Sequence, residues 1–130
     1  MTATLHIAGR LPGQNEMISS AKGFGGRGLG YSLLKKQWTK TVSDAAKSQR
    51  IPSFLRARLS FTWHEPKPSK FIKARDPDNI IGGQKMVLDG LVMAKVLPND
   101  THAYVAGLNH GFSIGRGPAG VTICIEEVET

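Results

Sequence analysis

The chain has 130 residues and a mass of 14.1 kDa, which fits one folded domain over residues 1–130 and excludes a multidomain machine. Its net charge of +7 and pI of about 9.9 make nucleic acid the first candidate partner. The single cysteine, Cys124, cannot form an internal disulfide, and neither a signal-peptide pattern nor an apolar run of about 20 residues is present. We therefore expect a cytoplasmic protein that does not enter a membrane.

The first quarter of the chain is predicted to hold a strand and a basic loop. Residues 3–9 read as a short strand, and a turn follows at residues 11–15. Residues 17–30 are rich in Gly and Ser and are predicted as a mobile loop. Because glycine lets the backbone come close to a ligand, we expect Lys22 and Arg27 of this loop to contact a phosphate backbone.

A helix, a strand and a long connection are predicted next. Ser32 is expected to cap a helix that ends near Ser48, with Trp38 packing in the core from its apolar face. Residues 55–63 alternate strictly between apolar and polar side chains and give the clearest strand pattern. Residues 64–75 contain two prolines and should form an exposed connection. Four cations of this connection are expected to contact the nucleic-acid backbone: Lys67, Lys70, Lys73 and Arg75.

The remainder of the chain is predicted to hold a helix and two strands. The helix is expected at residues 84–95, although the glycines at 82–83 leave open whether it begins earlier. Strands are expected at residues 103–112 and 120–128. The order strand, helix, strand, helix, strand, strand predicts a single α+β domain with a mixed four-stranded sheet and two main helices.

Charge is distributed unevenly along the chain. Residues 1–75 hold fourteen Lys and Arg against three acids, whereas residues 76–130 hold seven acids against three cations. A basic surface that meets a small acidic cluster is typical of a metal-dependent enzyme acting on a polyanion, because lysines hold phosphates while carboxylates hold the cation. The alternative is a basic binding module whose acids are ordinary solvated side chains.

Two carboxylates lie close together in the sequence Arg75-Asp76-Pro77-Asp78-Asn79. Proline disfavours the helical region for the residue before it, so an extended segment is predicted, with Asp76 and Asp78 on one side. A divalent cation with oxygen ligands, such as Mg²⁺, would relieve their repulsion. The alternative is that Asp78 or Asn79 caps the following helix while Asp76 is solvated.

The run RDPDNIIGGQKMVLDGLVMAKVLPND resembles the signature of the RusA family of Holliday junction resolvases, endonucleases that cut four-way DNA junctions using Mg²⁺. The chain's opening, with Pro12 and Asn15 after the first strand, is also similar to the family's N-terminus. The residues that match the family pattern are Asp76, Asp78, Asn79, Lys85, Asp89 and Asp100. The resemblance implies that Asp76, Asp78 and Asp100 hold Mg²⁺, for which Mn²⁺ can substitute, and that Lys85 stabilises charge on the phosphate.

One spacing departs from the family pattern. Lys85 lies seven residues after Asp78, whereas the family form has four, as if three residues had been inserted near the glycines at 82–83. Both spacings are near whole helical turns, so the lysine keeps its face and moves by about 4.5 Å. Alternatively, Lys85 forms only a surface ion pair with Asp89 four residues on, and Asp89 itself is either a partner of Lys85 or a helix-surface residue.

The position of Asp100 poses a geometric problem. A single straight helix over residues 79–96 would be about 27 Å long and would leave Asp100 far from Asp76. Either the region around residues 82–83 is not helical and the chain doubles back, or the second subunit of a dimer supplies Asp100.

The sequence thus predicts a homodimeric, Mg²⁺-dependent endonuclease that cuts four-way junctions and other branched DNA by paired symmetric cuts. A dimer is expected because two symmetric cuts need two identical sites related by a twofold axis. The rival prediction is a basic DNA- or RNA-binding module without catalysis.

Overall fold

The computed structural model describes residues 1–22 and 29–129. Four strands form one mixed sheet in the order β1-β4-β2-β3, in which β2 and β3 are parallel and the other neighbours are antiparallel. The strands are β1 (Thr2–Ala8), β2 (Ala57–Glu65), β3 (Val105–Ile114) and β4 (Gly120–Glu127). This architecture confirms the predicted α+β fold with a mixed four-stranded sheet. Strands β1 and β3 form its two edges.

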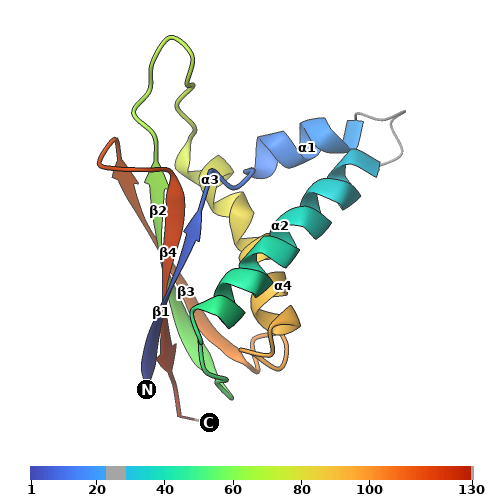
Figure 1. Cartoon of the computed structure of the whole chain (residues 1–130), viewed down its shortest axis with the longest axis vertical. Helices are drawn as coiled ribbons and strands as arrows, with labels where there is room; N and C mark the ends of the chain where they lie inside the picture. Colours follow the sequence, from blue (N-terminus) through green and yellow to red (C-terminus); the bar gives the residue numbers. More distant parts are fainter. Residues whose placement is uncertain (23–28, 130) are drawn as a thin grey trace.

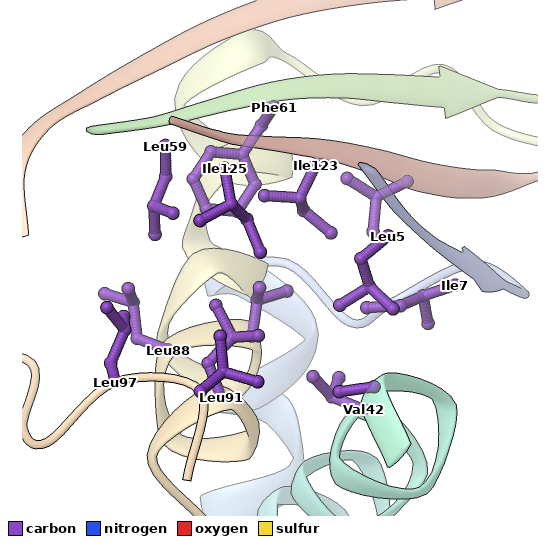
Figure 2. Packing of buried hydrophobic residues seen from close by; sticks show 14 of the residues in the cluster. Leu5, Ile7, Val42, Leu59, Phe61, Leu88, Leu91, Leu97, Ile123 and Ile125 are labelled. Carbon is purple, nitrogen blue, oxygen red and sulfur yellow. The ribbon is translucent and has the colours of Figure 1, made fainter. Parts of the chain in front are cut away.

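All the helices lie on one face of the sheet (Figure 1). They are α1 (Gln14–Lys22), α2 (Leu29–Ser48), α3 (Pro77–Ile80), the 3₁₀ turn η2 (Ile81–Gly83) and α4 (Gln84–Met93). The core fills the space between the sheet and the helices, where Phe61 and Ile123 of the sheet face Leu91 of α4 and Val42 of α2 (Figure 2). The opposite face of the sheet is uncovered in the described part of the chain, which explains the strict alternation of β2.

The sequence predicted most of these elements closely. Helix α2 begins three residues before Ser32, so Ser32 is not its cap. Strand β2 begins at Ala57 and extends to Glu65, while Leu55 is 63 % exposed and was wrongly assigned to the apolar face. Trp38 is half-buried against the edge of the core.

Helix α1 was not predicted, because its sequence was assigned to a glycine- and serine-rich loop. Its first turn has an N-terminal cap of its own: Glu16 Oε1 accepts the backbone N–H of Gly13 at 3.0 Å, and the N–H of Met17 bonds the Gly13 carbonyl at 3.0 Å. Met17 is buried on the inner face of this helix. The segment has a low helix propensity, and packing against α2 stabilises it as a helix.

The segment from α3 through η2 to α4 remains helical from Pro77 to Met93. The glycines at 82–83 therefore tighten the helix into one 3₁₀ turn and do not break it. After α4 the chain reverses through Lys95, whose φ is +62°, and returns alongside α4 toward β3. No helix in residues 1–22 and 29–129 has both the length and the apolar character needed to cross a membrane.

Candidate active site and nucleic-acid interface

The two neighbouring carboxylates lie at the start of α3. Asp76 is the N-cap residue, with φ −71° and ψ 151°, so the predicted extended conformation before proline is present at this residue. Asp78 already belongs to the first helical turn. The prediction that an extended segment places both side chains on one side is therefore wrong, because only Asp76 is extended. Both side chains are exposed, and neither accepts a hydrogen bond or an ion pair from the described residues.

Asn79 fixes the beginning of this helix to α1. Its buried Oδ1 accepts the backbone N–H of Asn15 at 2.7 Å, and its Nδ2 donates to Glu16 Oε2 at 3.1 Å. The Asp76 carbonyl accepts the N–H groups of Asn79 and Ile80 at 3.0 Å. The asparagine that follows the acidic pair is thus a structural anchor that holds the pair at the protein surface.

Arg75, expected to contact DNA, is instead the centre of a buried ion network. Its side chain is 8 % exposed, and its Nε and Nη2 donate to the two oxygens of Glu65 at 2.9 and 2.7 Å. Its Nη1 donates to the Leu11 carbonyl and to Glu16. Arg10 adds a further ion pair to Glu65 at 3.1 Å. With its donors occupied inside the protein, Arg75 presents no free guanidinium to a phosphate, which corrects the prediction.

The network keeps its carboxylates ionised. Burial alone would raise the pKa of Glu16, but hydrogen bonds from Arg75, the Gly13 backbone and Asn79 outweigh it and lower the pKa to about 2. The pKa of Glu65 is lowered in the same way, because Arg75 and Arg10 overcome the effect of burial. These ion pairs join the segment after β1, helix α1 and strand β2 to the segment that carries Asp76.

The returning chain brings Asp100 to Lys85. Lys85 Nζ lies 2.9 Å from Asp100 Oδ2 and 3.1 Å from Asp89 Oδ1, and Asp89 also pairs with Lys35 of α2 at 3.4 Å. Hydrogen bonds to Asp100 and then Asp89 raise the pKa of Lys85, and the Lys85 hydrogen bond lowers the pKa of Asp100. Lys85 therefore does not form only an i, i+4 surface pair with Asp89, because it also bonds a carboxylate 15 residues away.

The structure does not gather all the predicted ligands. Among the described residues, no three acidic, histidine or cysteine side chains are placed where they could jointly hold a metal ion. Asp100 and Lys85 form one group, and Asp76 and Asp78 form another at the beginning of the same helical segment. A helix continuous from Pro77 to Met93 rules out the explanation that residues 82–83 fold the two groups together.

Three predicted contact residues of the long connection are exposed: Lys67, Lys70 and Lys73. Phe71, at 90 % exposure, lies between them, with the Lys70 ammonium 5.8 Å from its ring centre. This connection extends beyond the end of the sheet (Figure 1). Arg27 and the side chain of Lys22 lie outside the described residues, so their predicted contacts are not tested.

A cleft of about 710 Å³ opens beside Asp76. Cations and an aromatic ring contribute to its walls through Arg10, Lys73 and Trp38, and Asp76 and Asn79 also line it. Cationic walls next to an exposed carboxylate suit a nucleic-acid backbone, because the cations attract its phosphates and the carboxylate can bind a metal ion beside them.

Sequence reasoning missed Arg10, Glu16 and Glu65 as residues that support this site. Glu16 carried a detectable signal, because an acid three residues after a helix cap is typical of a capping box. Arg10 and Glu65 carried none, since their partners lie 55 residues apart in the chain.

No family model matches the chain, and no curated protein matches it.

Proposed function

We propose that the protein is a Mg²⁺-dependent endonuclease that cuts four-way DNA junctions, and that it works as a homodimer. The observation that carries this proposal is the Lys85–Asp100 ion pair at 2.9 Å. Two residues selected only for their place in a motif meet in space: Lys85 lies on the helical segment that begins at the exposed Asp76 and Asp78, and Asp100 lies on the chain that returns after α4. A chance set of solvated acids would not be expected to do so.

The exposed carboxylates fit the chemistry of Mg²⁺. Asp76 and Asp78 offer hard oxygen ligands that are not occupied by cations of the described residues. When bound, Mg²⁺ would supply a Lewis acid that neutralises charge developing on the scissile phosphate. Lys85 has three N–H donors, of which two are directed at Asp100 and Asp89, so the third can serve a phosphate oxygen. Its hydrogen bonds to Asp100 and Asp89 raise its pKa further above the ordinary lysine value.

The third ligand is assigned to the second subunit. Because the helix from Pro77 to Met93 is continuous, Asp100 does not join Asp76 and Asp78 by a break within one chain. In a twofold dimer, Asp100 and Lys85 of one chain complete the site that Asp76 and Asp78 of the other begin.

Subunit mixing tests this assignment. Dimers of Asp78→Asn and dimers of Asp100→Asn are each expected to be inactive, but their heterodimer retains one intact site if the ligands come from both chains. Mixing the two variants should therefore restore nicking of a junction. If every site were built within one chain, the mixture would stay inactive, and this assignment would be wrong.

The DNA-contacting surface is the long connection between β2 and α3. Lys67, Lys70 and Lys73 attract the phosphate backbone, while the exposed ring of Phe71 offers a face for stacking on bases at a branch point, where the continuous base stack is interrupted. Such stacking favours branched DNA over a linear duplex.

The rival function is a basic nucleic-acid-binding module without catalysis. Synthetic four-way junctions and linear duplexes, each incubated with and without Mg²⁺, separate the two. We expect cleavage of the junction only, and only with Mg²⁺. Binding without cleavage under every condition would support the rival.

A further inference from the structure

The edge strand β3 carries a row of exposed apolar side chains. Leu108, Phe112 and Ile114 are 38, 39 and 49 % exposed. They are paired in register with Leu59, Trp63 and Glu65 of β2, so they are on the helix-covered side of the sheet, where they remain partly exposed. No charged residue and no proline occurs from Val105 to Ile114. Natural sheets commonly protect an exposed edge with such residues, and this edge has none.

His110 completes the row without introducing a charge. Its Nδ1 accepts the indole N–H of Trp63 at 3.0 Å, and its Nε2 lies 3.0 Å from Gln84 Oε1. Its ring stacks on Phe61 with centroids 4.9 Å apart. Burial lowers the pKa of His110, so the imidazole stays neutral at neutral pH.

The backbone groups of the same residues point outward. The N–H of Gly115 donates to the Glu65 carbonyl at 2.9 Å, which directs the backbone groups of that residue toward β2. Because successive residues of a strand direct these groups to opposite edges, the N–H and C=O groups of residues 108, 110, 112 and 114 face away from the sheet. The backbone groups of these four alternate residues are thus free to hydrogen-bond another strand.

The other edge of the sheet is protected. Gln49, which follows α2, uses its side-chain amide to bond both backbone groups of His6 in β1: its Oε1 accepts the N–H at 2.9 Å, and its Nε2 donates to the C=O at 2.7 Å. No side chain of residues 1–19 or 30–129 hydrogen-bonds the outward groups of β3 in this way. A side chain of the same molecule thus hydrogen-bonds the β1 edge, whereas the β3 edge has no such partner among these residues.

We propose that β3 pairs antiparallel with β3 of a second copy of this chain, on a twofold axis at Gly111. In this register Leu108 lies opposite the second copy's Ile114, and His110 lies opposite its Phe112. All four outward positions find a partner, and each pair is repeated by symmetry. Gly111 is suited to the axis, because a Cβ there would meet only the Phe61 carbonyl oxygen at 3.9 Å. The inference rests on the edge strand alone and does not depend on nuclease activity.

The exposed apolar area of the β3 row is large enough to form the centre of a dimer interface. At about 200 Å² for a fully exposed side chain of this size, the three exposed fractions leave about 250 Å² of apolar surface per chain. A standard interface buries about 800 Å² per partner, so the row would form its apolar centre, and seven paired backbone residues with their flanks would supply the rest. We expect dimerisation at micromolar concentration.

Disulfide trapping tests the register directly, in a background where Cys124→Ser removes the native thiol. Residues that face each other across a non-hydrogen-bonded antiparallel pair have Cα atoms about 4.5 Å apart, within the range of a disulfide. Gly111→Cys should therefore cross-link two chains under mild oxidation. The matched control is Asn109→Cys on the same face, whose two copies would be about 13 Å apart and should not cross-link.

Solution mass provides the second measurement. Light scattering at about 100 μM should give twice the mass of 14.1 kDa. Phe112→Lys should weaken dimerisation by about 100-fold or more, since lysine blocks edge pairing, while its circular dichroism reports whether it still folds. Leu55→Lys, which replaces an exposed leucine outside the edge, should leave the dimer intact. A monomeric wild type would overturn the proposal, and so would a dimer in which Gly111→Cys fails to cross-link. Neither result depends on whether DNA is cut.

Discussion

Replacing Arg75 by methionine tests the buried network that supports the acidic pair. The substitution keeps an unbranched, flexible side chain but removes the guanidinium, and with it the two hydrogen bonds to Glu65 and those to Leu11 and Glu16. Glu65, whose side chain is 7 % exposed, would keep only Arg10 as an ion-pair partner. Breaking a buried pair by removing one member costs about 3–5 kcal/mol.

Because Arg10 remains, we place the loss of unfolding free energy at the lower end, about 3 kcal/mol, out of a total of about 5–15 kcal/mol for a domain. Urea unfolding followed by tryptophan fluorescence measures it, since Trp63 lies in the core. Arg58→Met is the control, because Arg58 forms a surface pair with Glu126 and should lose less than about 1 kcal/mol.

A double variant separates the free-energy cost of an unpaired buried charge from the cost of lost packing. Removing the stranded carboxylate as well, in Arg75→Met with Glu65→Met, should recover at least half of the loss, because an apolar pair can replace a buried ion pair. A loss below about 1 kcal/mol in the single variant, or no recovery in the double variant, would refute the reasoning.

Three further predictions concern substitutions of single residues. Folding lowers the pKa of Glu16 from 4.5 to about 2, so its contribution to stability is present above pH 4.5 and is lost as the pH falls toward 2. Glu16→Gln should therefore flatten the pH dependence of the unfolding free energy between pH 4.5 and 2. Gly90→Ala would place a Cβ 2.5 Å from Val42 Cβ and should cost about 1–3 kcal/mol by thermal or urea unfolding. Lys85→Ala should slow junction cleavage with only a modest loss of affinity, as measured by single-turnover kinetics and a binding titration; an unchanged rate would make Lys85 a structural ion pair only.

The sequence predicted those parts of the fold in which local pattern and tertiary environment agree. Residues Ala57, Leu59, Phe61 and Trp63 alternate because one face of β2 is covered by helices and the other is not. Helix α1 was missed because its composition favours a loop and its stability comes from a cap and from packing on α2.

The candidate site was predictable from the sequence only in part. The motif identified Lys85 and Asp100, which meet although they are 15 residues apart. The basic composition of residues 64–75 suggested that Arg75 belongs to the DNA-contacting surface with its neighbours. Charge along the chain cannot reveal that Arg75 is buried, because its acidic partners Glu16 and Glu65 come from other elements of the fold.

The most direct test of the proposed function is to map cuts on a four-way junction whose strands are labelled one at a time. With Mg²⁺, the wild type should cut two opposite strands at symmetric positions, while Asp78→Asn should bind the junction as tightly or more tightly and leave it whole, because the change removes a metal ligand and a charge that repels phosphate. Unpaired nicks, or cutting that survives in Asp78→Asn, would contradict the proposed site.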